Sequence, residues 1–197
     1  MHFAKQILPH IHPHVDPTFV FHVVGANPMP QSVRALNGTR MDGVVRIVVH
    51  GFLSSSELRS LYGSVRVSLA PLRWGAGVKG KVNSAMSFGV PVIATSIASE
   101  GMFRDNGTNM LVHDDVKAFA NGVVQLHRDE ELWMKLREGG SRTLEEYFSV
   151  HRAAQGVAEM LNHLRSPQLE VENKSKRALP GSDRPCGDGA GRSTLAS

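Results

Sequence analysis

The chain has 197 residues, of which 41% are hydrophobic and 20% are charged, and this composition suits one globular domain with a sizeable core. It contains no apolar run long enough to span a bilayer and no continuous apolar segment typical of a secretory signal, so we expect no transmembrane segment. The formal net charge of +4 suits an anionic ligand, but it would equally suit a nucleic acid or an anionic membrane surface.

Before residue 63, apolar β-branched runs alternate with short helical signals. Ser54–Ser56 followed by Glu57 has the chemistry of a helix N-cap, and prolines and glycines separate the other segments. The expected elements are, in order, a helix over Phe3–Leu8 that stops at Pro9, a strand over Phe19–Val24, a helix over Gln31–Leu36, a strand over Val44–Val49 and a helix that ends at Tyr62.

Three histidines, His10, His12 and His14, stand at alternate positions between the first helix and the first strand. Prolines interrupt this segment, and no acidic or cysteine partner stands at a standard metal-ligand spacing. We therefore interpret it as a solvated connecting loop and expect no metal site there.

The stretch from Val65 to Thr95 combines a strand, a glycine-rich turn, a helix and a second strand. Val67–Pro71 and Pro91–Thr95 have the apolar composition of strands, and Val82, Ala85 and Met86 fall at helical spacing. A glycine turn that opens a helix exposes backbone N–H groups at the positive end of the helix dipole. The turn also carries three glycines and three cations: Gly75, Gly77, Gly80, Arg73, Lys79 and Lys81. The combination predicts a site for a phosphorylated ligand, and the alternative is a tight turn with solvated lysines.

Two common phosphate motifs fit this turn only in part. A P-loop needs a Ser or Thr after its lysine to bind magnesium, and that position is Val82, which excludes the motif. A dinucleotide fingerprint needs an acidic residue at the end of the next strand, where Thr95 and Ser96 stand. A dinucleotide site therefore stays a weaker alternative.

Continuous apolar strands that alternate with helices predict a parallel sheet covered on both faces, a Rossmann-like α/β fold. Ligands of such sheets bind beyond the carboxyl ends of the strands. Four segments follow predicted strands and should converge on one crevice: Gly25, His50–Phe52, the loop Arg73–Lys81 and Ser96–Gly101. For His50, a partly buried core histidine is an equal alternative.

The second half of the chain is predicted to be mostly helical. We expect a short strand over Asn109–His113, a helix over Val116–His127 capped by Asp114 or Asp115, a helix over Glu130–Glu146 and a last helix from Ser149 to about Leu164. Residues 1–165 should form one domain.

Beyond Ser166 the composition changes to Gly, Pro, Ser and scattered charge, so we expect residues 166–197 to be a disordered tail. Its basic residues are diluted by acids and lack interleaved aromatic residues, so no specific nucleic-acid contact is expected. The only cysteine, Cys186, lies in this tail and leaves no internal disulfide framework. This usage fits a reducing compartment, and we expect a cytoplasmic protein.

Three segments, APLRWGAGVKGKV, FGVPVIATSIASEGM and NGTNMLVHDD, resemble the donor-binding half of GT-B retaining glycosyltransferases of the group 1 type. The resemblance extends over roughly Phe3 to Leu164. It implies a C-terminal Rossmann-like domain, half of a GT-B fold, that binds a nucleotide-activated sugar as its substrate. The acceptor would bind mainly to a separate N-terminal domain, or to a partner chain, and the motif requires no metal or other cofactor.

The resemblance also implies roles for individual residues, although it names no catalytic residue. The donor and its phosphates would be bound by Arg73, Gly75, Ala76, Gly77, Val78, Lys79, Gly80, Lys81 and Ser84. The base, ribose and sugar would lie near Gly25, His50, Gly51, Phe52, Glu100 and Gly101.

Ser84 departs from the family pattern. Many members carry two glutamates eight positions apart, and the second, thought to hold the ribose, falls at Ser84, while the first falls at Ala76. Serine can replace at most one hydrogen bond, and the loss of a charge-assisted hydrogen bond costs about 1.5–3 kcal/mol, or roughly ten- to a hundred-fold in affinity.

The resemblance begins partway through the donor domain, so a first strand with its loop and a whole acceptor domain would be expected before Phe3. Either the chain is a fragment or it is a degenerate relative. The hypotheses are a glycosyltransferase donor half that works with missing sequence or a partner chain, a non-catalytic remnant that acts by binding, and, less favoured, a dinucleotide-dependent enzyme.

Overall fold

The computed structural model describes residues 2–15, 18–25, 30–41 and 45–165. Its chain divides into two compact units, Met1–Arg152 and Ala153–Ser197, and a single domain over residues 1–165 stays a prediction. The expected tail at 166–197, including Cys186, lies outside the described residues. Across the ranges that are described, no helix has the length and apolar character needed to cross a membrane.

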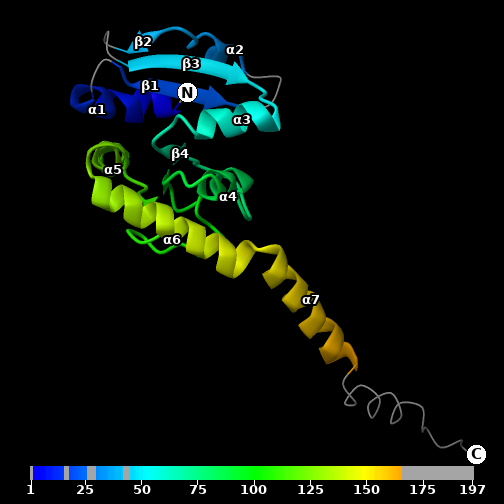
Figure 1. Cartoon of the computed structure of the whole chain (residues 1–197). Coiled ribbons are helices and arrows are strands. Elements are labelled where there is room, and N and C mark those ends of the chain that lie inside the picture. The colour runs from blue at the N-terminus through cyan, green and yellow to red at the C-terminus, as the bar shows by residue number, and fades with distance from the viewer. Residues whose placement is uncertain (1, 16–17, 26–29, 42–44, 166–197) are drawn as a thin grey trace, which may run out of the picture. The chain divides into compact units, whose positions relative to one another are not determined.

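The first unit alternates helices with short strands (Figure 1). Its elements are the π-helix η1 (Phe3–Ile7), α1 (Leu8–Ile11), the 3₁₀ turn η2 (His12–His14), β1 (Val20–Val24), α2 (Gln31–Arg34), β2 (Arg40–Met41), β3 (Val45–Gly51), α3 (Ser55–Tyr62), β4 (Ser68–Ala70), α4 (Gly80–Ser87), β5 (Val92–Ala94), β6 (Leu111–Val112), α5 (Val116–Arg128) and α6 (Glu130–Phe148). Helix α7 (Val150–Arg165) continues into the second unit.

The strands form two three-stranded sheets rather than one continuous sheet. The first has the order β1-β3-β2 and the second has the order β4-β5-β6. All pairs are parallel except β2 with β3, and β2 is a strand that the sequence did not predict. The α/β fold with parallel pairing is confirmed, but the single sheet is not, because β1 pairs only with β3 and β4 pairs only with β5 among the described strands.

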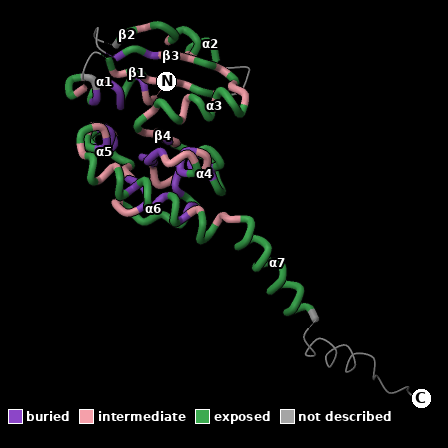
Figure 2. The backbone as a smooth tube through the Cα atoms, viewed as in Figure 1, coloured by how far each residue is buried: buried purple, intermediate pink, exposed green. Residues whose placement is uncertain are grey.

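The helices cover both faces, and one core connects the two sheets. Side chains of α1 and α5 join β3 of the first sheet to β5 and β6 of the second in a cluster that includes Leu8, Ile47, Ile93 and Phe119. A second cluster lies on the other face of β4 and β5, under α4 and α6. Figure 2 shows the buried residues gathered where these helices meet the strands.

Local signals in the sequence set the helix boundaries. Ser54 and Glu57 form a capping box at the start of α3, as expected. Asp115 and Asp129 cap α5 and α6 by accepting hydrogen bonds from backbone N–H groups three residues later. Each cap satisfies N–H groups that have no partner inside the helix.

The chain stays helical past Pro9, so the predicted stop there is wrong. The π-helical turn η1 ends with the Leu8 N–H bonded to the Phe3 carbonyl, and α1 then runs from Leu8 to Ile11. Pro9 is the second residue of α1, directly after the π-helical turn. The histidine segment is likewise partly helical, since His12–His14 form a 3₁₀ turn.

In the second unit, the described part of α7 exposes every side chain whose burial is known (Figure 2). Apolar residues recur along it at helical spacing, among them Val157, Met160, Leu161 and Leu164, with exposed fractions between 48% and 63%.

Candidate functional site

The glycine-rich turn joins β4 to α4, as the sequence predicted. Gly75 and Gly77 have φ angles of +129° and +73°, in the region that favours glycine, so the loop needs both residues. Arg73 stands above the ring of Trp74, which is 76% exposed, with 5.7 Å between the guanidinium carbon and the ring centre. Ala76 and Val78 are also exposed.

The two lysines of the turn differ in their surroundings. Lys79 is only 9% exposed, and its ammonium group folds back to donate a hydrogen bond to the Gly77 carbonyl. A Cβ atom at Gly75 would lie 3.6 Å from Lys79 Cε, so the loop wraps closely around this side chain. Lys81 is exposed. Lys79 therefore holds the loop in shape, and Lys81 has its charge available to a ligand.

Helix α4 begins without a side-chain cap. Its first intrahelical hydrogen bonds run from the N–H groups of Val82 and Asn83 to the Lys79 carbonyl. The N–H groups of Gly80 and Lys81 precede these bonds and lie at the positive end of the helix dipole. An uncapped helix start of this kind is suited to binding an anion.

The turn after β5 packs against the glycine loop. Thr95 Oγ1 donates to the Leu72 carbonyl and accepts from the Ala98 N–H, which ties the two loops together. Gly101 has a φ angle of +71°, and a Cβ atom there would lie 3.3 Å from a methyl carbon of Val78. Glu100, beside it, is exposed. The structure therefore brings Gly101 to the predicted phosphate loop.

The carboxyl ends of β1 and β3 carry the other predicted residues. The Gly25 N–H donates to the Gly51 carbonyl at 3.0 Å, and Phe52 is 70% exposed. His50 Nε2 lies 2.9 Å from His22 Nδ1, and the two rings are stacked with their centres 5.1 Å apart. Burial lowers the pKa of His22, and the neighbouring His50 and Arg46 lower it further. His50 is exposed, so its interpretation as a core histidine is wrong.

A cleft of about 780 Å³ lies between α4, which follows the glycine-rich turn, and β1. It is lined by Lys81 and Ser84 from α4 on one side and by all of β1, including His22, on the other. The remaining predicted residues lie outside its lining, so convergence of all of them on one crevice stays a prediction.

His22 is the residue of this region that sequence reasoning missed. It stands inside an otherwise apolar strand, VFHVV, and this single polar position was the available signal. Its pairing with His50 depends on the parallel register that sets His22 opposite Val48. Among the residues that the structure describes, no group of three or more His, Cys, Asp or Glu side chains could hold a metal ion.

Comparison with known protein families shows to which family this chain belongs. The model of the family described as glycosyl transferases group 1 matches residues 1–129, more than half of the chain. The chain belongs to this family. A curated relative, an uncharacterized 44.6 kDa protein in the cps region of Klebsiella pneumoniae, is 32% identical over 76 residues. That match covers 39% of this chain and 20% of the relative.

Solved structures agree on the fold. The Anabaena protein HepE in complex with UDP-glucose matches with a TM-score of 0.63 and 17% identity, over 81% of this chain and 46% of HepE. TarM matches with a TM-score of 0.62 and 16% identity, over 81% of this chain and 32% of TarM. The C-terminal domain of LpcC from Francisella tularensis matches with a TM-score of 0.52 and 12% identity, over 74% of this chain and 94% of that domain. This family member therefore has the fold of a GT-B C-terminal domain and spans less than half of HepE and TarM.

Proposed function

We propose that this chain is the donor-binding half of a glycosyltransferase, which binds a nucleotide sugar and transfers the sugar together with an acceptor-binding domain or partner chain. The uncapped start of α4, behind a glycine loop and beside the exposed Lys81, carries the proposal. A diphosphate at this point would accept hydrogen bonds from the Gly80 and Lys81 N–H groups and would meet the Lys81 ammonium.

The proposal assigns different tasks to the two lysines. Lys79 preorganises the loop through its hydrogen bond to Gly77, while Lys81 binds the diphosphate directly. Fixed N–H groups and a cation neutralise the phosphate charge in this arrangement, so it needs no metal ion. Glu100 and Gly101, on the turn that packs against Val78, would lie toward the sugar or ribose.

Family membership and the structural neighbours support the substrate class. HepE, which shares this fold over 46% of its length, has been crystallised with UDP-glucose and with UDP. Here a nucleoside diphosphate sugar is the donor expected from the family and from the anion-binding geometry. Transfer itself needs an acceptor held beside the donor in a water-excluding site, which we assign to a second domain.

Isothermal titration calorimetry with UDP, GDP, ADP and NAD tests donor binding. We expect one nucleoside diphosphate to bind and Lys81→Ala to weaken it about ten- to a hundred-fold, the typical effect of losing a charge-assisted hydrogen bond. Lys135→Ala, at an exposed position of α6, is the matched control and should leave the affinity unchanged. Absence of binding by all four ligands would refute the proposal, and tight NAD binding would favour a dinucleotide-dependent enzyme instead.

A second candidate is a binding module without transferase activity, and Ser84 favours it. Ser84 lines the cleft on α4 at the position where the family pattern has a glutamate. Retained donor affinity without transfer, even when an acceptor domain from a close relative is fused to the chain, would support this candidate.

A further inference from the structure

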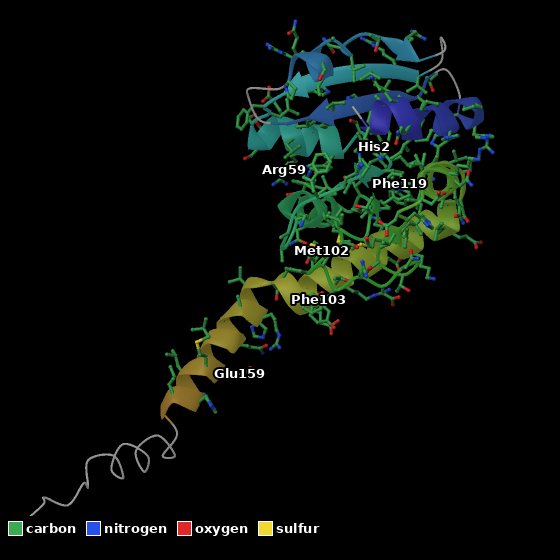
Figure 3. The ribbon with its side chains drawn as sticks, turned by 180° about the vertical axis from the view of Figure 1, so that it is seen from behind. His2, Arg59, Met102, Phe103, Phe119 and Glu159 are labelled. Carbon is green, nitrogen blue, oxygen red and sulfur yellow. The ribbon has the colours of Figure 1, made fainter. Side chains whose placement is uncertain are left out.

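Three arginines of the first unit stand over aromatic rings, at the opposite end of α4 from the glycine-rich turn. The guanidinium carbons of Arg66 and Arg137 lie 5.4 and 5.5 Å from the centre of the Trp133 ring. Arg59 projects from α3 (Figure 3), and its guanidinium carbon lies 5.4 Å from the centre of the Phe88 ring. All three arginines are exposed, whereas both rings are half-buried. The rings therefore support the cations from below.

One backbone position connects the two groups. Phe88 is the C-cap of α4, and Gly89 follows it with a φ angle of +70°. A Cβ atom at Gly89 would lie 3.0 Å from Arg137 Nε, so Arg137 rests on the neighbour of the ring that carries Arg59. Tyr62 of α3 stacks on Phe88 with 4.9 Å between ring centres. We call this surface the arginine–aromatic patch, and its residues are Arg59, Tyr62, Arg66, Phe88, Gly89, Trp133 and Arg137.

Hydrogen bonds fix one side of the patch. The Trp133 indole N–H donates to the Arg66 carbonyl at 2.7 Å, and Arg66 Nε donates to the Leu126 carbonyl at 3.3 Å. These bonds join α6 and the end of α5 to the segment that precedes β4. A guanidinium that rests on a ring still presents N–H groups at its edge, arranged to bind both oxygens of a carboxylate. The patch is therefore preorganised for oxyanions.

The protein itself leaves these charges uncompensated. Within the described ranges, none of the three arginines forms an ion pair, while Arg142 lies 4.0 Å from Glu138 on the same helix α6 as Arg137. Glu130, one turn before Trp133, is exposed and belongs to no ion pair with the patch. Like charges gathered on one surface repel one another, so a bound anion would stabilise this arrangement.

The aromatic residues of the patch indicate which class of anion fits. Trp133, Phe88 and Tyr62 are all half-buried, so no apolar side chain of the patch stands out for insertion into a bilayer. The rings of Trp133 and Phe88 already carry guanidinium groups, which occupy the faces that nucleic-acid bases would need for stacking. Arginine and aromatic residues are instead enriched where protein interfaces have their strongest contacts.

We propose that the arginine–aromatic patch is the docking surface for an acidic segment of a partner protein. Its Asp or Glu side chains pair with Arg59, Arg66 and Arg137, and the complementary charge removes the repulsion among the three arginines. Because the patch and the glycine-rich turn lie at opposite ends of α4, docking leaves the candidate donor site open. The inference is independent of nucleotide-sugar binding.

The test uses the full chain and a fluorescent peptide of about ten residues with Glu at alternate positions, which places carboxylates on one side about 7 Å apart when the peptide is extended. A peptide with Gln in place of Glu is the control. Fluorescence anisotropy measures the Kd, and two-dimensional NMR follows the indole N–H signals of the two tryptophans. We expect the acidic peptide to shift the Trp133 signal and to leave that of Trp74, on the glycine-rich turn, unchanged. The Gln peptide should shift neither.

Paired variants separate the patch from overall charge. Arg59→Gln with Arg137→Gln removes two charges and spares Arg66, which has a structural hydrogen bond. We expect this variant to raise the Kd at least about ten-fold. Arg59→Lys with Arg137→Lys should also weaken binding, because lysine lacks the planar fork. Lys135→Gln with Arg142→Gln, at exposed positions of α6, removes the same charge and should change the Kd less than about two-fold.

Two kinds of result would overturn the proposal. One is an unshifted Trp133 signal at about 1 mM acidic peptide, or an equal loss of affinity in both glutamine variants. The other is tighter binding of an RNA of about ten nucleotides, or of vesicles that contain phosphatidylserine, through Arg59 and Arg137. The patch would then serve a different class of partner.

Discussion

Two neighbouring lysines show how far a residue's role depends on its surroundings. Lys79 and Lys81 stand two positions apart and look alike in the sequence as cations of a phosphate loop. The structure buries Lys79 against Gly77 and leaves Lys81 exposed at the cleft. Substitution of Lys79 would therefore disturb the loop as well as its charge, so Lys81 is the better probe of ligand binding.

Restoring the family's acidic residue at Ser84 should strengthen donor binding. A glutamate there would reach the cleft and accept charge-assisted hydrogen bonds from ribose hydroxyls, worth about 1.5–3 kcal/mol. We expect Ser84→Glu to lower the Kd for the bound nucleoside diphosphate about ten-fold or more, measured by calorimetry. Ser87→Glu, on the exposed side of the same helix, controls for added charge and should not improve binding. Equal affinity of Ser84→Glu and the parent chain would contradict the proposed position of the ribose.

The contact of His22 with His50 should make the stability of the folded chain depend on pH. The lowered pKa of His22 means that the folded state binds fewer protons than the unfolded state, whose histidines titrate near 6.5. The free energy of unfolding should therefore fall as the pH drops through about 6.5, and the contribution of His22 to stability is fully present above that pH. Urea unfolding between about pH 5 and 8 measures this slope, and His22→Gln should reduce it. His10→Gln, at an exposed position, is the control. A slope that is the same in both variants would exclude His22 as its source.

At the scale of elements, α6 holds the loop that leads from the candidate site to β6. Asn109 is buried, and its side-chain amide donates to the Phe103 carbonyl and to Thr143 Oγ1 of α6. Phe103 is the residue at this bend (Figure 3). It has a positive φ of 49°, and its ring stacks on that of Tyr147. These contacts fix the turn that carries Glu100 and Gly101 through a helix distant in sequence.

The approach of α6 to this loop requires glycine at position 139. A Cβ atom there would overlap the carbonyl oxygen of Thr108, and that backbone atom has little freedom to move. We expect Gly139→Ala to lower the free energy of unfolding by about 3 kcal/mol, measured by chemical denaturation. Ser141→Ala, exposed on the same helix, should change it by less than about 0.5 kcal/mol. A neutral Gly139→Ala variant would show that the helix and loop can separate without loss of stability.

At the scale of the whole first unit, one apolar cluster holds together two sheets that share no strand pairing. Leu8 and Ile11 of α1 are fully buried in this cluster with residues of both sheets, and Phe119 of α5 lies among them (Figure 3). Because the helices provide this connection, the two sheets should unfold as one cooperative unit.

Leu8→Ala tests this cooperation. The substitution should lower the free energy of unfolding by about 2–5 kcal/mol. It should lower the exchange protection of amides in both β3 and β5 by the same free energy. Native-state hydrogen exchange measures both strands in one sample. Leu161→Ala, a half-exposed leucine of α7, should leave the protection of both strands unchanged. Loss of protection in β3 alone would mean that the sheets unfold separately.

The sequence by itself determined the elements and the family. Helix starts depend on side chains within three or four residues of each other. The capping box at Ser54 and the caps at Asp115 and Asp129 can therefore be predicted from short stretches of sequence. The glycine turn before α4 is also local, because Gly75 and Gly77 adopt backbone angles that other residues rarely adopt. The motifs around that turn were enough to identify a GT-B glycosyltransferase fold, which the family match bears out.

Only the tertiary structure decided which strands pair and which side chains meet. The pairing of β1 with β3 and of β4 with β5, the burial of Lys79, the contact between His22 and His50, and the packing of Gly139 on Thr108 all join residues through space. Strand pairing and burial depend on residues far apart in the chain, and no local pattern encodes them. The split into two sheets follows for the same reason, because a continuous apolar strand predicts a sheet but does not indicate which strand lies beside it.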